Sequence, residues 1–334
     1  MIETLSLRNF KILREVDVRL RPLTLIVGPN ASGKSSLLQA LAGLTKSGSQ
    51  NGCGREFAGA FGGPERFQSY VPNGPLVLEC SGHHAGRPFT LRLAPEPNEL
   101  PPPVASRKLL FLDDESFPLS RPATVMSLDV KKMAARSFVK ETNQTLPSDG
   151  GGLSTILADL YLEHPARYRG MVDRLRKVIP SVQDLRVRRT EDGYELIFDM
   201  LGGKGMPAAV VSEGTLLTLG LLTLLMAPSA PELVLIDDLE RGLHPAALGD
   251  LVKQFRALQE QNPELQIVAT SHSPYLLDHL NADEILLTSL DEEGYAAVRP
   301  LTDHPDYERW KDVMAPGEFW STVGERWVTE QAPR

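Results

Sequence analysis

One short segment near the N-terminus constrains the fold more than any other part of the chain. It matches the pattern G-x-x-x-x-G-K-[ST] at every fixed position and reads Gly28-Pro29-Asn30-Ala31-Ser32-Gly33-Lys34-Ser35. Glycines let the backbone curl so that successive N–H groups converge on phosphate oxygens, and a following helix adds the dipole of its N-terminus. The strand pattern of residues 15–27 and the helical pattern of residues 35–44 supply the required flanks. The segment therefore predicts a phosphate-binding loop, rather than a chance glycine-rich turn.

The residue types in this loop point to ATP and Mg²⁺ as its ligands. We expect the Lys34 ammonium to reach the β- and γ-phosphates and the Ser35 hydroxyl to ligate Mg²⁺. The residues expected to contact the nucleotide here are Asn30, Ala31, Ser32, Gly33, Lys34, Ser35 and Ser36. The loop thus predicts an ATPase.

Two adjacent carboxylates follow a second apolar strand. Residues 233–236 are all aliphatic, and Asp237 and Asp238 come directly after them. A P-loop enzyme needs a carboxylate to hold the water shell of its metal, so we assign that role to Asp237. The next side chain would point towards the attacking water, which makes Asp238 the candidate general base. Two solvated acids capping a strand are the alternative, and the complete P-loop upstream favours the metal site.

A histidine follows the next apolar strand. Residues 265–272 end in a polar turn that contains His272. At a strand end beside the phosphates, an imidazole can hydrogen-bond the γ-phosphate or the attacking water. Lone histidines are usually structural, but the position of His272 after the carboxylates favours a catalytic role, together with Asp238 and Lys34.

The rest of the chain predicts strands and helices around these motifs. The expected elements are strands at 2–10, 76–79, 89–93 and 108–112, helices at 128–142 and 153–179, and a strand pair at 182–188 and 194–200. We predict a single discontinuous domain over residues 1–334. Its parts are a lobe with the P-loop, a strand and helix insertion, a second nucleotide-binding lobe and a tail, at residues 1–45, 46–205, 206–300 and 301–334.

Charge is unevenly distributed along the chain. The formal net charge is −8, yet residues 121–190 hold thirteen Lys or Arg and only seven Asp or Glu. A basic segment on an acidic body suggests an anionic partner, such as DNA bound through its phosphates. The basic residues concerned are Lys131, Lys132, Arg136, Arg167, Arg169, Arg174, Arg176, Lys177, Arg186, Arg188 and Arg189. A solvated helical surface is the alternative, and the sequence leaves both open.

Composition excludes several other classes. The two cysteines, Cys53 and Cys80, lie outside any CxxC pattern, which argues against a disulfide framework or a zinc site. The N-terminus has no apolar stretch of signal-peptide length, and the longest apolar run, residues 216–227, falls short of the ~20 residues of a membrane span. We expect a cytoplasmic protein with no membrane partner.

The motifs together resemble those of a known group of ATPases. The segments that carry the resemblance are LSLRNFKILREVDVRLRPLTLIVGPNASGKSSLLQAL, VSEGTLLTLGLL from Val211, LIDDLERGLHP and TSHSPYLLD. They resemble the first strand pair with Walker A, the signature motif, Walker B with the D-loop, and the switch-histidine motif of ABC-type ATPases of the RecF, SMC and OLD group, catalogued as AAA-family proteins. The resemblance implies an α/β P-loop NTPase of ABC-ATPase head type, with a mixed sheet, an insertion and a three-layer αβα core.

The resemblance also implies a composite site between two subunits. Heads of this group sandwich ATP in a homodimer. Ser212, Glu213 and Gly214 of one subunit would therefore contact the γ-phosphate held by Lys34 of the other. An ordinary helix N-cap is the alternative for this segment, and the two roles are compatible because a cap presents the same donors.

The chain departs from the family pattern at two places. Asp238 stands where the family usually has a glutamate, and its side chain is one methylene shorter, which implies slow turnover. The glutamine that links the phosphate to the insertion in this family has only a weak candidate, Gln68.

For function, the resemblance implies an ATPase in DNA repair or anti-phage defence. The chain ends too soon after His272 for the TOPRIM nuclease domain of OLD nucleases, so a separate effector such as a nuclease is expected. Trp310, Trp320 and Trp327 all fall in the tail, which is either packed on the body or exposed to dock that effector. The alternatives are a nucleotide-controlled regulatory scaffold with little hydrolysis and, more remotely, a transporter ATPase, whose usual LSGGQ signature the SEGT segment does not match.

Overall fold

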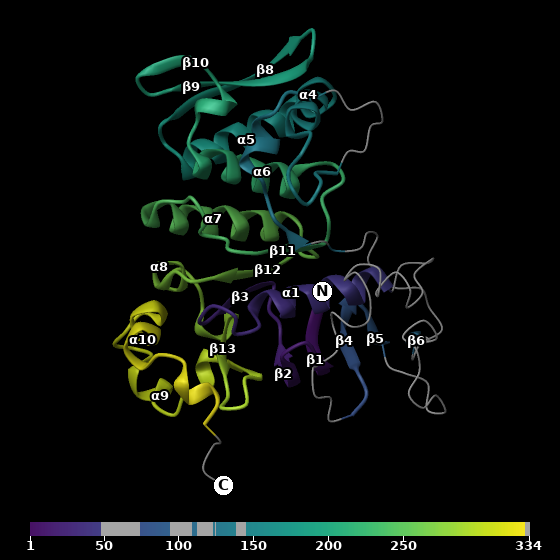
Figure 1. The fold of residues 1–334 in the computed structure, drawn as a ribbon. Coiled ribbons are helices and arrows are strands. Elements are labelled where there is room, and N and C mark those ends of the chain that lie inside the picture. The colour runs from purple at the N-terminus through teal and green to yellow at the C-terminus, as the bar shows by residue number, and fades with distance from the viewer. Residues whose placement is uncertain (48–73, 94–108, 112–122, 124, 138–144, 331–334) are drawn as a thin grey trace. The chain divides into compact units, whose positions relative to one another are not determined.

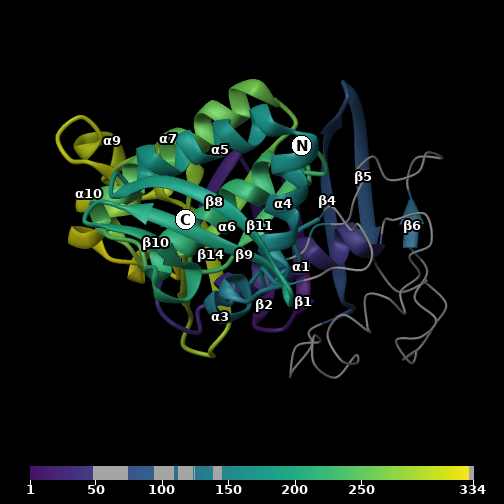
Figure 2. The same ribbon diagram turned by 90° about the horizontal axis from the view of Figure 1, so that it is seen from above.

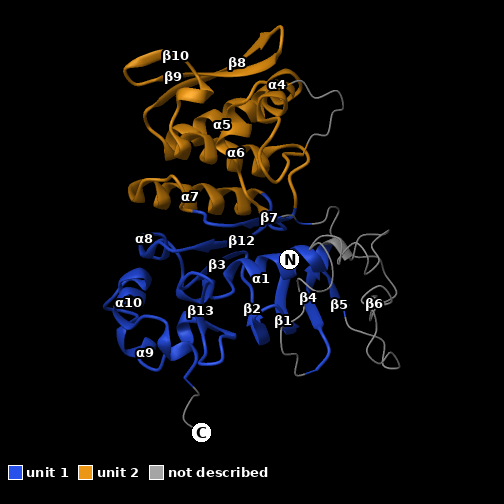
Figure 3. Cartoon of the chain, viewed as in Figure 1, with its two compact units in different colours: residues 1–125, 232–239, 262–334 blue, residues 126–231, 240–261 orange. Residues whose placement is uncertain are grey.

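Separate stretches of sequence come together in two units of structure (Figure 3). The computed structural model describes residues 1–47, 74–93, 109–111, 123, 125–137 and 145–330. Unit 1 is formed by residues 1–125, 232–239 and 262–334, and unit 2 by residues 126–231 and 240–261. Among the described helices, none is both long enough and apolar enough to cross a bilayer.

A six-stranded mixed sheet, most of which lies in unit 1, has the strand order β14-β13-β3-β12-β11-β7, and Figure 1 labels its strands β13, β3, β12 and β11. Its strands are β3 (Leu23–Val27), β7 (Val125–Met126), β11 (Leu233–Ile236), β12 (Gln266–Ser271), β13 (Ile285–Leu290) and β14 (Ala296–Pro300). The central strands β13, β3, β12 and β11 are parallel, and every residue of β3 and β11 is buried. Parallel strands of this kind read as continuous aliphatic runs. Their carboxyl ends meet at one edge of the sheet, where the P-loop and both aspartates follow.

A second sheet of unit 1 is antiparallel, with the order β2-β1-β4-β5-β6. Its strands are β1 (Ile2–Phe10), β2 (Leu13–Arg19), β4 (Val77–His84), β5 (Arg87–Leu93) and β6 (Leu109–Phe111). Helix α1 (Lys34–Ser47) contacts β11 and β12 of the first sheet and β1, β4 and β5 of the second. Its leucines Leu37, Leu38 and Leu41 are almost completely buried in the core that both sheets share. This packing fixes the direction in which the start of α1 points.

One predicted strand is two strands in the structure. The pattern over residues 15–27 predicted a single strand, but β2 ends at Arg19 and β3 begins at Leu23. β2 pairs with β1 in the antiparallel sheet, whereas β3 pairs with β12 and β13. The chain therefore changes sheets at residues 20–22, where Pro22 has no N–H to donate to a strand ladder.

Unit 2 combines helices with a three-stranded antiparallel sheet of order β10-β9-β8 (Figure 2). Its elements are α3 (Val130–Ala134), α4 (Leu153–Glu163), α5 (Pro165–Val178), β8 (Val182–Thr190), β9 (Gly193–Met200), β10 (Gly203–Pro207), α6 (Glu213–Met226) and α7 (Pro245–Gln261). Helix α6 is buried from Gly214 to Leu225 and contacts α3, α4 and α5. A helix that is apolar on all sides is the expected centre of such a cluster.

Both helices predicted in this region are shorter than expected. The helix predicted over residues 153–179 is interrupted at His164, because Pro165 lacks an N–H and occupies the first position of α5. Within the range 128–142, where one helix was predicted, the described residues form only the short helix α3, which ends at Ala134. Ser137 instead forms an isolated bridge with Tyr194, and residues 138–144 lie outside the described part of the chain.

A buried carboxylate ties β9 to its neighbours in unit 2. Glu195 is 8% exposed, and its oxygens lie 2.5 Å from an Arg188 nitrogen and 3.1 Å from an Arg136 nitrogen. The hydrogen bond from Arg188, with that from Arg136, outweighs burial and holds the pKa of Glu195 below its ordinary value. We expect Glu195→Gln to lower the free energy of unfolding by about 1–3 kcal/mol, because a charged acceptor shared by two guanidinium groups is lost.

The same variant should change how stability depends on pH. A carboxyl whose pKa is lowered by folding stabilises the folded state above its unfolded pKa of about 4.3, and this contribution is lost as pH falls through the folded pKa. Urea unfolding between pH 7 and pH 3 should therefore show a steeper acid loss for the wild type than for Glu195→Gln. Glu191→Gln is the matched control, because Glu191 is exposed. If the free energy of unfolding fell equally steeply with pH for the wild type and for Glu195→Gln, an ionic role of Glu195 would be contradicted.

Candidate functional site

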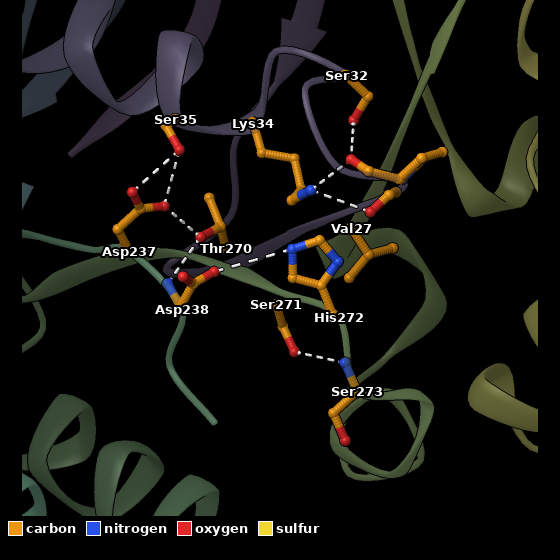
Figure 4. A network of polar contacts seen from close by, with 12 residues as sticks. Val27, Ser32, Lys34, Ser35, Asp237, Asp238, Thr270, Ser271, His272 and Ser273 are labelled. Carbon is orange, nitrogen blue, oxygen red and sulfur yellow. Dashed lines mark hydrogen bonds and ion pairs between the residues drawn. The ribbon is translucent and has the colours of Figure 1, made fainter. Parts of the chain in front are cut away.

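The predicted phosphate-binding loop joins the end of β3 to the start of α1 (Figure 4). Its backbone turns through positive φ at Gly28 (+148°), Ala31 (+61°) and Gly33 (+95°). Glycine enters this region at little cost, which is why the motif places it at two of these positions. Asn30 and Ala31 are exposed, while Ser36 is half-buried in the first turn of α1. The loop therefore has the curled backbone that phosphate binding requires.

The side chain of Lys34 lies inside this loop. Its Nζ donates hydrogen bonds to the carbonyl oxygens of Gly28 (3.0 Å) and Pro29 (2.7 Å), and the residue is 6% exposed. Ser32 Oγ donates to the same Pro29 carbonyl at 2.8 Å. The ammonium group is thus already held at the concave side of the loop, where a phosphate would enter.

Thr288 of β13 packs closely against Gly28 of the loop. A methyl group added at Gly28 would lie 2.3 Å from the Thr288 carbonyl oxygen and 2.4 Å from Thr288 Oγ1. We therefore expect Gly28→Ala to lower the free energy of unfolding by about 1–3 kcal/mol through overpacking. We also expect ATP binding to weaken at least tenfold, as measured by titration with a fluorescent ATP analogue. Gly86→Ala is the control, since Gly86 also has positive φ (+77°) but no atom within 4 Å of the added carbon. Equal ATP affinity in the two variants would contradict the prediction.

Asp237, the carboxylate predicted to hold the metal, contacts Ser35, the other predicted metal ligand. Ser35 Oγ lies 2.9 and 3.1 Å from the two carboxylate oxygens of Asp237 (Figure 4). Asp237 also accepts a hydrogen bond from Thr270 Oγ1 at 2.6 Å. Ser35 lies in α1, Asp237 directly follows β11, and Thr270 lies in β12. Parallel pairing of Ile236 with Ala269 sets the register of β11 and β12, so that Asp237 and Thr270 are close. The structure therefore brings Ser35 and Asp237 together at the strand ends.

The second predicted carboxylate lies beside the predicted histidine. Asp238 has φ of +55°, a left-handed conformation that Asp tolerates better than most residues. Its N–H donates to Thr270 Oγ1 at 2.9 Å, and its carboxylate lies 3.9 Å from His272 Nε2. Both side chains are substantially exposed, at 53% and 40%. A water molecule therefore has access to both groups.

Thr270 is the site residue that the sequence did not reveal. It is fully buried, and its hydroxyl contacts Asp237 while accepting a hydrogen bond from the backbone of Asp238. One hydroxyl thereby contacts both the carboxylate of Asp237 and the backbone of Asp238. The only sequence signal was a polar residue near the end of an apolar strand, which is a weak indication by itself.

The oxygen donors at this edge fit Mg²⁺. Mg²⁺ is usually bound through one or two protein oxygens together with substrate phosphates and water, which is the set that Ser35 and Asp237 could complete. Within the described residues, no group of three or more His, Cys, Asp or Glu side chains could hold a metal ion by itself. The site therefore suits a metal that arrives with a phosphorylated ligand.

The predicted signature residues start helix α6 in unit 2. Ser212 is the N-cap, and its Oγ accepts a hydrogen bond from the Thr215 N–H at 3.4 Å. Glu213 forms an ion pair with Arg241 at 3.0 Å. A methyl group at Gly214 would lie 2.2 Å from the Gly242 carbonyl oxygen, so this glycine allows close backbone approach. Ser212 thus acts as an N-cap in the structure. The segment that follows Leu239 packs against the first turn of α6 through Arg241 and Gly242.

Many basic residues of the insertion are paired within unit 2. Five of the eleven form ion pairs, namely Lys132 with Asp149, Arg136 with Glu195, Arg176 with Asp173, Arg186 with Asp199 and Arg188 with Glu195. Arg174 donates to the side chain of Gln254 at 2.9 Å. Paired cations contribute less net attraction for a polyanion than isolated ones. The weak glutamine candidate, Gln68, lies outside the described residues.

Comparison with known proteins identifies the family. The family model described as "AAA domain, putative AbiEii toxin, Type IV TA system" matches residues 23–278, from the strand before the P-loop to the helix after His272. The chain belongs to this family. Together with the relatives below, the match confirms the prediction that the chain is an ABC-type ATPase of the RecF, SMC and OLD group.

Two curated relatives match parts of this AAA-family chain. An OLD nuclease of Thermus scotoductus is 46% identical over 41 residues, which is 12% of this chain and 8% of the nuclease. The Septu protein PtuA of Bacillus thuringiensis is 29% identical over 105 residues, which is 29% of this chain and 26% of PtuA. The chain therefore aligns with a small fraction of each relative.

Solved structures of SMC heads share the fold. The SMC head bound to the C-winged helix domain of ScpA superposes with a TM-score of 0.63 at 15% identity, covering 89% of this chain and 97% of that one. A Pyrococcus furiosus complex of an SMC head with the C-terminal domain of ScpA gives a TM-score of 0.61 at 12% identity, covering 93% and 99%. These likenesses confirm the predicted α/β P-loop NTPase fold of ABC-ATPase head type.

Proposed function

We propose that this chain binds ATP with Mg²⁺ and hydrolyses it to ADP and phosphate. The observation that carries the proposal is the contact of Ser35 with Asp237 next to a loop that already encloses the Lys34 ammonium. Bound Mg²⁺ would supply neutralisation of the phosphate charge. Lys34 would exchange its carbonyl acceptors for the β- and γ-phosphates. Phosphate release under steady state tests this. Mg²⁺-dependent turnover that is lost in Asp237→Ala supports the proposal, and no turnover by the wild type contradicts it.

Asp238 and His272 form the hydrolytic side of the proposed site. Asp238 would take a proton from the attacking water as the new bond to the γ-phosphorus forms and the bond to the β-phosphate oxygen breaks. His272 would hydrogen-bond the γ-phosphate or that water. The exposure of both side chains supports access for water, and their separation of 3.9 Å leaves room for a shared hydrogen-bonding partner.

The signature residues are proposed to act in a second subunit. Ser212 presents a hydroxyl and the first N–H groups of α6 at a helix start, which suits contact with a γ-phosphate. A mixing experiment tests this dimer. Lys34→Ala and Ser212→Arg protomers should each be inactive, and a mixture should regain turnover because one intact composite site forms. A mixture as inactive as its components would contradict the dimer.

The biological context proposed is DNA repair or anti-phage defence with a separately encoded effector, such as a nuclease. The partial matches to an OLD nuclease and a Septu protein support this context. Purification together with the products of neighbouring genes tests it. A stable complex whose activity responds to ATP supports the proposal, and an isolated chain in every purification contradicts it.

The proposal includes DNA binding by the basic residues of the insertion that are left after five of the eleven form ion pairs within unit 2. Fluorescence anisotropy of labelled duplex DNA, with and without ATP, tests it. Binding that weakens steeply with salt supports a phosphate contact. No binding at low salt in either state removes DNA from the proposal.

The second candidate is a regulatory scaffold that closes on ATP without appreciable hydrolysis. The short side chain of Asp238 favours it, since a carboxylate one methylene shorter than glutamate holds the water less well. ATP-dependent dimerisation without phosphate release would select this candidate over the ATPase.

A further inference from the structure

The switch-histidine segment is covered by a helix of the C-terminal tail. Helix α8 (Pro274–Leu277) begins two residues after His272, and α10 (Pro316–Val323) packs against it (Figure 1). Both helices belong to unit 1, as does the P-loop. The tail therefore reaches the polypeptide that carries His272.

The contact between these helices leaves no room for a side chain. A methyl group added at Gly317 would lie 2.0 Å from the Pro274 carbonyl oxygen and 2.6 Å from Asp278 Oδ1. Gly317 is buried, and its φ is not in the left-handed region, so the reason for glycine here is contact rather than backbone conformation. The separation of α8 and α10 is thus set by backbone atoms.

A carboxylate from the switch segment caps the tail helix. The residue at the N-cap of α10 is Ala315, which has no side-chain acceptor. Asp278 Oδ1 instead accepts the Gly317 N–H at 2.8 Å. A carboxylate at a helix N-terminus satisfies an otherwise unpaired donor and is favoured by the helix dipole. Asp278 is the C-cap residue of α8, so this hydrogen bond joins the end of α8 to the start of α10.

The tail is itself anchored to the body of unit 1. The His304 ring makes edge-to-face contacts with the rings of Phe319 and Trp327, at centroid distances of 5.1 and 5.0 Å. Trp327 and Val328 are 7% and 1% exposed, and their turn contacts β13 and β14. The sequence left open whether the tail is packed on the body or exposed to a partner. The segment around Trp327 is packed on the body. A helix fixed in this way can hold the switch segment in one position.

We propose that α10 positions His272, through the Asp278 cap and the close contact at Gly317. The inference rests on the proposed ATPase function, because His272 is assigned to the γ-phosphate or the water there. Asp278 and Gly317 are positioning residues in this scheme and do not touch the substrate. The same coupling in the opposite direction would carry the state of the γ-phosphate to the tail.

Two substitutions at Asp278 test the positioning role. Asp278→Ala removes the acceptor for the Gly317 N–H, whereas Asp278→Asn keeps an oxygen in the same place. We expect Asp278→Ala to lower kcat at least tenfold with an ATP Kd within about twofold of wild type, and Asp278→Asn to stay within about threefold in kcat. A purely structural role would lower thermal stability without this split between kcat and Kd. Wild-type kcat in Asp278→Ala would overturn the proposal.

Glycine substitutions give an independent test. Gly317→Ala should force α8 and α10 apart and lower kcat at least tenfold. Gly324→Ala is the matched control, because it lies just after the same helix, where an added methyl group meets no atom within 4 Å. Gly324 has positive φ (+66°), so its variant also reports the effect of a strained tail. Equal kcat in the two variants would contradict the proposal.

Tryptophan fluorescence separates this inference from the function on which it rests. The chain has three tryptophans, Trp310, Trp320 and Trp327, and all lie in the tail. A non-hydrolysable ATP analogue should change the emission of the wild type, ADP should change it less, and Asp278→Ala should abolish the difference. This readout needs no turnover, so failure of hydrolysis alone leaves it intact. Unchanged emission at saturating analogue, with binding shown by calorimetry, would overturn the inference.

Discussion

Replacing Lys34 by alanine should weaken ATP binding by about 100-fold and remove hydrolysis. Lys34 is 6% exposed, and its ammonium is held inside the loop by the Gly28 and Pro29 carbonyl oxygens. A hydrogen bond from a charged group contributes up to about 3 kcal/mol, and each 1.4 kcal/mol changes an affinity tenfold. Loss of this one cation is therefore sufficient for the expected change. Titration with a fluorescent ATP analogue and steady-state phosphate release measure the two effects.

The control for this variant is Lys311→Ala in the tail. Lys311 pairs with Glu308 on the surface at 2.7 Å, and surface pairs contribute little to stability. We expect Lys311→Ala to bind and hydrolyse ATP like the wild type. Thermal unfolding of Lys34→Ala should show a folded protein, since the neighbouring carbonyl oxygens can be hydrated at the open side of the loop. ATP affinity within fivefold of wild type would exclude Lys34 as a phosphate contact.

The parts of the site that the sequence predicted are those encoded by short motifs. Ser35 and Asp237 were each expected at the end of an apolar strand or the start of a helix. In a parallel sheet such ends meet at one edge, so their contact followed from the fold class. The family and the fold predicted from the motifs are confirmed by the comparisons.

Thr270 and Thr288 could not be predicted, because their positions depend on strand register. Thr270 reaches Asp237 because Ala269 is paired with Ile236. Thr288 reaches Gly28 because β13 runs beside β3. Strands buried on both faces give continuous aliphatic runs without alternation, so the pattern does not encode which residues are opposite each other.

Two errors in the predicted elements had visible causes. The strand predicted over residues 15–27 and the helix predicted over residues 153–179 each contain a proline, Pro22 and Pro165, where the structure breaks them. Continuous hydrophobic patterns on both sides concealed the breaks. The tail contact at Gly317 had no such local signal, because it depends on tertiary packing between segments about 40 residues apart.

Replacing Asp238 by asparagine should lower kcat by about 100-fold or more while ATP affinity stays within about threefold of wild type. Asparagine has nearly the same size and tolerates the φ of +55° found here, so the backbone should not change. The Asp238 N–H would still donate to Thr270. What is lost is the ability to accept a proton, and general base catalysis typically contributes 10²- to 10⁴-fold. Phosphate release and ATP titration on the same preparations measure the split.

Asp238→Glu is the companion variant, because glutamate is the residue that the resemblance to ABC-type ATPases implies at this position. A left-handed backbone costs a residue such as glutamate about 1–2 kcal/mol, so we expect lower thermal stability. The longer side chain should bring the carboxylate closer to the attacking water, so we expect higher turnover than in the wild type. If Asp238→Asn instead kept wild-type turnover, Asp238 would not be the base. If both variants and the wild type bound ATP and dimerised without phosphate release, the regulatory scaffold would replace the ATPase as the function of this site.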